Sequence, residues 1–346
     1  TNGSFSQEGS EQITNGDFAT DSDWSKQTGW SISGGSANCD GTQSGGTAIY
    51  QSVFQQNKSY KITFSITDIS SGGVGVVNSP KQTSIGTYTY YYYTTSSDTN
   101  LYINADADFI GSIDNVSVKE VGQDWTLGTG WSIGDDKAIK TSGTGSSLVQ
   151  SVPTTTIGKT YKLTFDAIAT SGVANATLYG ITIPTFSTSG SQEHFITATS
   201  TSGFIFYGND FFNGSITNIS VKEVGQNWTL GSGWSIGEDK AVAGSLSNGA
   251  DIRQVGIFQQ SKKYKISIDA DKISGTNIIL RTYNGSFQTI GDLTENSSFI
   301  YTTTATNNGT LYIVSNNFIG SITNVSIIEI TDDTNLPRIN YSGFTY

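Results

Sequence analysis

Residues that commonly anchor chemistry are scarce in this chain of 346 residues. It has one cysteine (Cys39), one histidine (His194) and no methionine. A single cysteine cannot form an internal disulfide, so the sequence excludes an internal disulfide framework. Because no initiator methionine is present, we expect a processed chain or a segment of a longer protein.

Charge is also sparse. Charged residues make up 14% of the chain, and the net charge is −11. Binding to nucleic acid depends on clustered Lys and Arg that neutralise phosphates, so this balance argues against a nucleic-acid partner. The negative net charge argues equally against binding to an anionic membrane surface. No apolar run approaches the roughly 18–20 residues that a membrane-spanning helix needs, and we expect no membrane insertion.

The residues that are abundant favour β-structure. Gly, Ser, Thr and Asn are frequent, aromatic residues reach 12%, and helix formers are few. Apolar and polar residues alternate at 60–64, 161–165 and 264–268. Period-two alternation buries one face of a strand and leaves the other in solvent. No long stretch has helical periodicity, so the sequence predicts an all-β protein.

The chain contains three copies of one unit. A motif Gly-Ser-Ile-x-Asn-Val/Ile-Ser begins at Gly111, Gly214 and Gly320. Near the start of each unit, two tryptophans stand six residues apart: Trp24 and Trp30, Trp125 and Trp131, Trp228 and Trp234. A repeat of roughly 100 residues is too long for a solenoid turn and matches a self-contained sandwich. We expect the tryptophans to belong to the cores.

These landmarks predict the domain organisation. We expect an N-terminal lead or linker at 1–12, sandwich repeats at 13–122, 123–225 and 226–331, and a C-terminal tail at 332–346 that leads to a further or missing domain. The joints near Gly122 and Gly225 are short, and short linkers permit little independent swinging. The sequence therefore predicts an elongated, semi-rigid array.

The first copy resembles a known family. The opening Asn15-Gly16-Asp17-Phe18, the tryptophan pair, the strand at 60–64 and the closing strand at 113–118 resemble jelly-roll carbohydrate-binding modules of the galactose-binding-like superfamily. The second and third copies lack the Asn-Gly-Asp-Phe opening. The resemblance implies three tandem jelly-roll β-sandwich domains, but fold alone does not specify a ligand. Residues 331–341 are similar to a stretch that follows such modules in bacteriophage structural and tail-fibre-like proteins.

Nothing in the sequence indicates catalysis. A Ser-His-Asp or metal site would have to use His194, which we interpret as a lone surface histidine. Glycoside cleavage needs two acids held across a cleft. The adjacent acids at 135–136 and 238–239 are each followed by a lysine and are more typical of turns. We expect no enzyme activity and no required cofactor.

One metal site follows from the family resemblance. Jelly-roll modules commonly hold a structural calcium near the first and last strands, with oxygen ligands. Asp17 and Asp114 occupy the matching positions in the first repeat. Thr217 and Thr323 replace the second acid in the other repeats, which places the possible calcium in repeat 1 only. Alternatively, the two acids satisfy hydrogen bonds at turns or strand ends.

Sugar binding relies on exposed aromatic rings, and the tyrosine run at 88–93 is the most conspicuous candidate. On a strand, Tyr88, Tyr90 and Tyr92 face one way and Tyr91 and Tyr93 the other. Aligning Tyr92 with Phe195 and Phe299 places the even set inward and makes Tyr91, opposite His194 and Ser298, the first candidate for an exposed ring. Candidate sugar-binding residues are Tyr88, Tyr90, Tyr91 and Tyr93, with an inter-domain or inter-subunit contact as the alternative. Phe211, Phe212, Tyr283 and Phe287 are weaker candidates.

We expect a non-catalytic structural or adhesive protein of a bacteriophage virion, as a fibre, tail or capsid decoration. Its expected partners are cell-surface glycans and other virion proteins, it is expected to be a homo-oligomer, and its location is the virion surface or the extracellular space. Tandem copies suit adhesion because weak sites gain from multivalency. The alternatives are a bacterial secreted or cell-surface polysaccharide-binding protein and a purely architectural spacer.

Overall fold

A computed structural model describes residues 3–77, 79–95, 97–151, 155–283, 285–305 and 309–331. Within these ranges the chain forms antiparallel strands, turns and one short 3-10 helix, η1 (Ser245–Ser247), and no α-helix. The all-β prediction is confirmed. No helix in the described part has the length and hydropathy needed to cross a membrane. The predicted tail at 332–346 lies outside the described residues.

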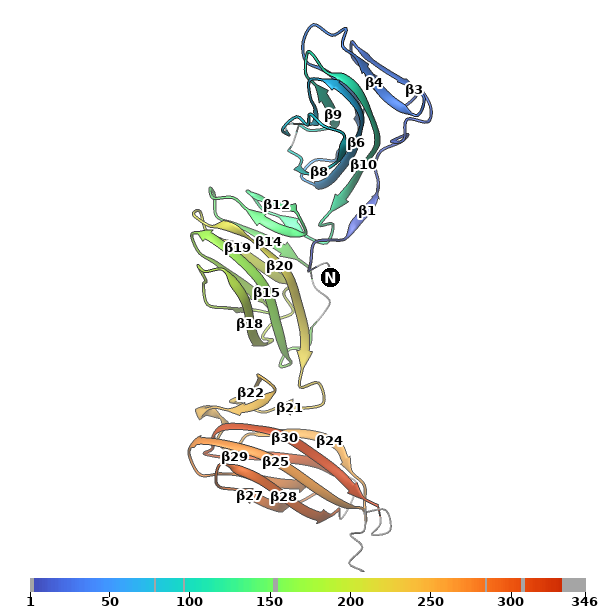
Figure 1. Cartoon of the computed structure of the whole chain (residues 1–346). Helices are drawn as coiled ribbons and strands as arrows, with labels where there is room; N and C mark the ends of the chain where they lie inside the picture. Colours follow the sequence, from blue (N-terminus) through green and yellow to red (C-terminus); the bar gives the residue numbers. More distant parts are fainter. Residues whose placement is uncertain are drawn as a thin grey trace, which may run out of the picture. The chain divides into compact units, whose positions relative to one another are not determined.

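Repeat 1 contains two antiparallel sheets (Figure 1). One has the order β3-β4-β10-β6-β8, with β1 also paired to β10, and the other has the order β2-β5-β9-β7. The strands are β1 (Glu8–Glu11), β2 (Ser25–Lys26), β3 (Trp30–Ser33), β4 (Ser36–Asp40), β5 (Thr47–Ser52), β6 (Ser59–Ser71), β7 (Val74–Val76), β8 (Gly86–Tyr93), β9 (Asn100–Ala105) and β10 (Ile110–Val121).

Repeat 2 has the strand orders β12-β13-β20-β15-β18 and β11-β14-β19-β16-β17, which match those of repeat 1 except that β17 adds an edge strand to the second sheet. Its strands are β11 (Thr126–Leu127), β12 (Trp131–Gly134), β13 (Lys137–Lys140), β14 (Ser146–Gln150), β15 (Thr160–Ser171), β16 (Ala174–Leu178), β17 (Ile181–Thr182), β18 (Gly190–Thr197), β19 (Phe204–Gly208) and β20 (Asn213–Val224).

Repeat 3 follows the same plan, β22-β23-β30-β25-β28 and β21-β24-β29-β26-β27. Its strands are β21 (Thr229–Leu230), β22 (Trp234–Gly237), β23 (Lys240–Ala243), β24 (Asp251–Phe258), β25 (Lys263–Ser274), β26 (Asn277–Tyr283), β27 (Phe287–Leu293), β28 (Ser297–Thr304), β29 (Gly309–Asn316) and β30 (Ile319–Ile330).

Successive strands alternate between the two sheets, as in a double-sheet jelly roll. From β4 to β10, even-numbered strands lie in one sheet and odd-numbered strands in the other. Inward side chains of both sheets meet in one core; in repeat 1, Phe64 of β6 and Ile103 of β9 belong to the same buried cluster. In repeat 2, the rings of Phe165 and Phe206 meet edge to face across the sheets, with centroids 5.6 Å apart. Five of the six paired tryptophans are buried, as predicted; Trp228 is half-buried.

The chain divides into two compact units. Unit 1 comprises Thr1–Thr155, Leu163–His194 and Ser200–Val221, and unit 2 comprises Thr156–Lys162, Phe195–Thr199 and Lys222–Tyr346. The boundary between the units passes through repeat 2, because the start of β15 and the end of β18 belong to unit 2. Contacts of this end with repeat 3 therefore lie inside unit 2, whereas contacts between repeats 1 and 2 lie inside unit 1.

In each repeat, the sheet that contains the closing strand (β10, β20 or β30) begins with the same tight hairpin. Two residues with positive φ connect the strands: Gly34 and Gly35, then the acids at 135–136, then those at 238–239. Two positive φ angles define a type I′ turn, which matches the twist of the flanking strands. The interpretation of these acids as turn residues is confirmed.

The repeated Asn of the closing motif forms a bulge. Asn115, Asn218 and Asn324 have φ angles of 52°, 55° and 51°, a region that Asn tolerates better than most residues. In β10 the register against β6 shifts between Asp114 and Ser117, which leaves Val116 outside the ladder. The Val116 amide is therefore free to donate to an atom outside the β6–β10 ladder.

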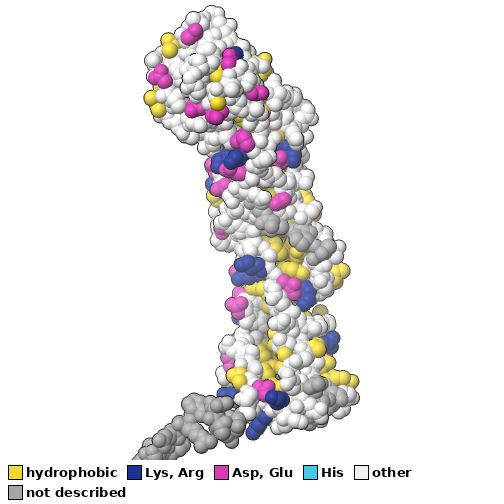
Figure 2. Space-filling model, turned by 90° about the vertical axis from the view of Figure 1, so that its right-hand side faces the viewer, with side chains coloured by type: hydrophobic (Ala, Val, Ile, Leu, Met, Phe, Trp, Pro, Cys, Tyr) yellow, Lys and Arg dark blue, Asp and Glu magenta, His cyan; other side chains and the backbone are white. Residues whose placement is uncertain are grey.

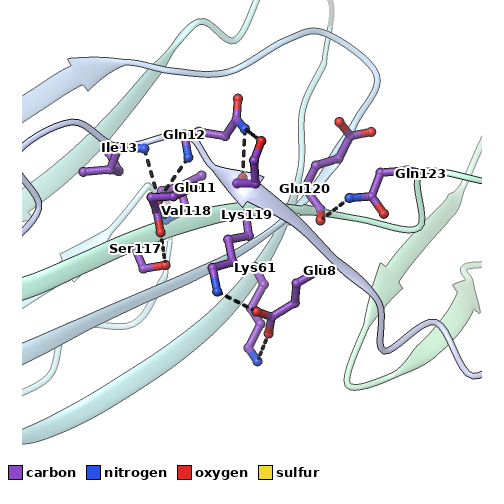
Figure 3. Close-up of polar contacts among 11 residues, drawn as sticks. Glu8, Glu11, Gln12, Ile13, Lys61, Ser117, Val118, Lys119, Glu120 and Gln123 are labelled. Carbon is purple, nitrogen blue, oxygen red and sulfur yellow. Dashed lines mark hydrogen bonds and ion pairs between the residues drawn. The ribbon is translucent and has the colours of Figure 1, made fainter.

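The prediction of an N-terminal lead or linker at 1–12 is wrong. Residues 8–11 form β1, which pairs with β10 in the register Glu8↔Val121 and Glu11↔Lys119. Figure 3 shows the ion pairs of Glu8 with Lys61 and Lys119, at 2.6 and 2.9 Å. The Glu11 carboxylate accepts a hydrogen bond of 2.7 Å from the Val118 amide. These contacts attach the segment to the sheet.

The Glu8 contacts predict a pH dependence. Hydrogen bonds from Lys61 and then Lys119 hold the pKa of Glu8 below its ordinary value. A carboxyl group with a lowered pKa stabilises the fold above its unfolded pKa of about 4.3 and loses this contribution as the pH falls through the folded value. We expect the NMR shifts of the β1 amides to move toward random-coil positions as the pH falls below about 4.3, the unfolded value. Glu8→Gln should lack most of this transition; the same profile in that variant would contradict the assignment.

Candidate binding surfaces

The even-numbered tyrosines of β8 point into the core, as predicted. The ring of Tyr88 lies 5.8 Å and that of Tyr90 6.2 Å from the ring of Phe64, centroid to centroid. Tyr92 lies 5.6 Å from Phe54. The Tyr90 hydroxyl also accepts a hydrogen bond of 2.7 Å from the Gln82 amide. Tyr88 and Tyr90 are thus half-buried and bound within repeat 1, which leaves little ring surface for a sugar.

The alignment of this strand across the repeats needs correction. Tyr88 pairs with Phe64 in repeat 1, and Phe299 pairs with Ile268 in repeat 3. Phe64 and Ile268 hold the same place in their strands, so Phe299 corresponds to Tyr88 and not to Tyr92. The loops before β8 and β28 differ, and a count along the sequence could not detect the shift.

The prediction that Tyr91 is an exposed ring is wrong. Tyr91 is half-buried, and a Cβ added to Gly134 would lie 3.3 Å from the Tyr91 Cβ. Burial raises the pKa of its phenol, Lys61 opposes this shift, and the hairpin acids Asp136 and Asp135 add to it. Tyr91 therefore packs against the first hairpin of repeat 2, the inter-domain contact that the sequence left as its alternative. Tyr93, on the same face, is also half-buried.

The same contact recurs one repeat later, inside unit 2. A Cβ added to Gly237 of β22 would lie 3.5 Å from the ring of Phe195. The Lys162 ammonium lies 5.6 Å from the centroid of that ring, as expected for a cation–π pair. Lys162 corresponds to Lys61, which pairs with Tyr91, so Phe195 holds the position of Tyr91. In both cases, the aromatic residue at this position (Tyr91 or Phe195) packs against a glycine in the first hairpin of the next repeat (Gly134 or Gly237).

His194 is not a surface histidine. Its ring stacks on Phe165, with centroids 6.4 Å apart and planes 25° from parallel, as Tyr90 stacks on Phe64 in repeat 1. Burial lowers the pKa of the imidazole. Its Nε2 is buried, and no described residue forms a hydrogen bond with it. The side chain therefore belongs to the inward face of β18.

Asp17 and Asp114 lie on adjoining segments, because the Val116 amide donates to the Gly16 carbonyl at 2.8 Å. Each carboxylate has a local partner: Asp17 accepts from the Ala19 amide at 3.4 Å, and Asp114 from the Asn115 amide at 2.6 Å. These are the turn and strand-end hydrogen bonds of the alternative interpretation. The described residues contain no cluster of three or more acidic, His or Cys side chains arranged to hold a metal. Calcium in repeat 1 stays a prediction.

The Asn-Gly-Asp-Phe opening of repeat 1 is a docked segment. The Gly16 carbonyl accepts from the Val116 amide, and a Cβ on Gly16 would lie 2.1 Å from the Val116 oxygen. Phe18 is 1% exposed, and its ring lies 5.2 Å from that of Trp24. The Trp24 indole donates to the Asn15 carbonyl at 2.9 Å. The segment thus uses the amide freed by the β10 bulge and fills the space beside the tryptophan.

Repeat 2 holds the same kind of segment, taken from the chain's N-terminus. The Gly3 carbonyl accepts from the Ile219 amide at 2.9 Å, and a Cβ on Gly3 would lie 1.9 Å from the Ile219 oxygen. Phe5 is 1% exposed, and its ring lies 5.0 Å from that of Trp125. The predicted lead therefore completes repeat 2. The signal in the sequence was the pair Thr-Asn-Gly-Ser-Phe at 1–5 and Thr-Asn-Gly-Asp-Phe at 14–18.

The most exposed aromatic cluster lies on repeat 3, which the tyrosine run did not indicate. On β29, Leu311 and Ile313 are buried, so Tyr312 between them points to the outer face of the sheet. Its ring lies 6.1 Å from Tyr283 and 5.2 Å from Phe287. Tyr283 and Phe287 are 42% and 54% exposed. We call Tyr283, Phe287, Tyr312, Arg253 and Arg281 the aromatic platform.

Two arginines flank these rings. Arg253 and Arg281 pair with Tyr312 from the strands on either side. The guanidinium of Arg253 lies 5.8 Å from the Tyr312 centroid, and that of Arg281 5.7 Å from the Phe287 centroid. Arg281 Nε is buried and has no hydrogen-bond partner among the described residues. Over the face of the molecule drawn in Figure 2, charged side chains of both signs are scattered and do not form a large patch of one sign.

Comparisons with known proteins give only loose matches. No protein-family model and no curated protein matches the sequence. Among solved structures, the N-terminal CBM22-1-CBM22-2 tandem domain from Paenibacillus barcinonensis Xyn10C has 13% identity and a TM-score of 0.27, over 63% of this chain and 99% of that chain. The secreted serine protease VesC from Vibrio cholerae has 9% identity and a TM-score of 0.23, over 65% and 62%. Sulfolobus Turreted Icosahedral Virus has 11% identity and a TM-score of 0.21, over 87% and 91%.

Proposed function

We propose that this chain is a non-catalytic binding protein that attaches to surface glycans through the aromatic platform of repeat 3. The observation that carries the proposal is the contact of three rings on an outer sheet face, two of them exposed. Aromatic faces stack against the C–H faces of pyranose rings, and guanidinium groups donate to sugar hydroxyls.

Removing the central ring tests this function. We expect Tyr312→Ala to weaken binding of the full chain to its best glycan on an array at least tenfold, because both flanking rings and both arginines are arranged around Tyr312. Tyr207→Ala is the matched control, since this tyrosine is 39% exposed and lies outside the platform. Retention of full affinity by Tyr312→Ala, or the absence of any glycan ligand, would contradict the proposal.

Repeats 1 and 2 act in this proposal as a spacer. The packing of Tyr91 against Gly134 in unit 1 and of Phe195 against Gly237 in unit 2 favours an architectural role for these joints. Tyr91→Ala should therefore leave glycan binding unchanged, whereas an adhesive role of the tyrosine run requires a loss of binding.

The setting that we propose is the surface of a bacteriophage virion, where the chain would contact other virion proteins as a homo-oligomer. Its support is the similarity of residues 331–341 to a stretch of phage structural proteins. A bacterial secreted polysaccharide-binding protein remains the alternative. Mass spectrometry of purified virions separates the two, because a protein that is secreted by cells and absent from particles cannot be a virion component.

A further inference from the structure

Repeat 3 carries the residues that receive an Asn-Gly-x-Phe segment in the other two repeats. Trp228 takes the place of Trp24 and Trp125 in the sequence unit. Val325 follows the bulged Asn324, as Val116 follows Asn115. Among the described residues, none outside the strand ladders forms a hydrogen bond with the Val325 amide. Repeat 3 therefore has the receiving elements without the segment.

A cavity occupies the corresponding position. Its volume is about 350 Å³, and it lies within unit 2. Trp24 and Trp125 are 6% and 7% exposed, whereas Trp228 is half-buried. Ile133 is 2% exposed, whereas its counterpart Ile236 is half-buried. The apolar lining residues are Trp228, Ile236, Ala241, Ile252, Ile322 and Val325.

From this correspondence we infer that the cavity is a docking groove for an Asn-Gly-x-Phe segment of another polypeptide. The phenylalanine ring enters the apolar cavity beside Trp228, as Phe5 lies beside Trp125. The glycine carbonyl accepts from the Val325 amide, as Gly3 accepts from Ile219. Glycine is required because any Cβ at this place would strike the strand's carbonyl, at 1.9 Å in repeat 2.

Both segments of this kind within the described residues are already docked, through Gly3 on repeat 2 and Gly16 on repeat 1. Neither is therefore free to fill the groove of repeat 3. A further Asn-Gly-Ser-Phe sequence at 284–287 connects β26 to β27, and Tyr283 and Phe287 of that hairpin pair with each other.

A labelled peptide tests the inference on the full chain. The probe is Thr-Asn-Gly-Asp-Phe-Ala-Thr, the sequence of residues 14–20, followed by fluorescence anisotropy. We expect one peptide to bind per chain. Replacing the peptide's Phe by Ala should weaken binding at least tenfold, because the cavity is then left unfilled. Replacing its Gly by Val should do the same, because a side chain there blocks the close approach to the strand that carries Val325. No binding of the parent peptide, or equal binding of the altered peptides, would overturn the inference.

The site of binding is checked separately. Hydrogen exchange at the Val325 amide should slow at least tenfold when the peptide binds, and exchange at Val116 should not change. Trp228→Ala should weaken peptide binding. If this variant does not fold, the exchange measurement on the unaltered chain alone shows whether the peptide binds in the groove of repeat 3. Protection at Val116 or Ile219 in place of Val325, or self-association that the peptide prevents, would also overturn the inference. Glycan binding involves other residues, so either proposal can fail alone.

Discussion

Replacing Phe18 by Ala is expected to destabilise repeat 1 by about 3–5 kcal/mol, the usual cost of removing a buried phenylalanine. The ring is 1% exposed and packs on Trp24, with centroids 5.2 Å apart. Its loss leaves a cavity next to the indole, whose hydrogen bond to Asn15 also holds the segment. Phe18 has a φ of 50°, a region that is unfavourable for Ala as well. The substitution therefore relieves no backbone strain.

The measurement must isolate repeat 1, since a chain with several cores need not unfold in one step. Urea-dependent hydrogen exchange of peptides from β6 and β10 reports the local free energy of unfolding. Phe211→Ala provides the control, because that ring is 71% exposed and its removal should change stability by less than about 0.5 kcal/mol. Equal effects of the two substitutions would show that the Asn-Gly-x-Phe segment contributes little to repeat 1.

The sequence was sufficient for the fold because its repeats reveal their own strands. The alternation at 60–64, 161–165 and 264–268 appears in β6, β15 and β25, whose inward residues are buried. Period-two patterning also placed Tyr88, Tyr90 and Tyr92 on one face, but the choice of that face as the inward one came from an alignment whose register the structure corrects. The alternation and the shared face depend only on neighbours along one strand.

Features that depend on partners far apart in the chain could not be predicted in this way. Tyr91 faces outward from its own sheet, as expected, but Gly134 of the next repeat covers it. Tyr312 and Phe287 stand on different strands, and only the register brings their rings to 5.2 Å. Phe5 completes a sandwich whose first tryptophan is Trp125. Such contacts leave no local pattern, apart from the repeated Thr-Asn-Gly-x-Phe.

Gly111→Ala is the second substitution with a large expected effect, about 1–3 kcal/mol of destabilisation from overpacking. An added Cβ would lie 2.3 Å from the Asp68 carbonyl oxygen and 3.1 Å from the Ile69 Cα. Both are backbone atoms of β6, the neighbour of β10, so relief requires the two strands to separate. The same glycine opens the motif in the other repeats, where a Cβ on Gly214 would lie 2.0 Å from the Ile168 oxygen.

Gly45→Ala is the matched control, because a Cβ at that glycine meets nothing within 4 Å. We expect it to change stability by less than about 0.5 kcal/mol. The same exchange measurement on β6 and β10 compares the two variants, and a loss confined to Gly111→Ala would show that the motif's glycine serves close strand approach. If both variants were equally stable, the repeated glycine would need another explanation. The closing strand also carries the Val116 amide that binds Gly16, so separating it from β6 should loosen the Asn-Gly-x-Phe segment as well.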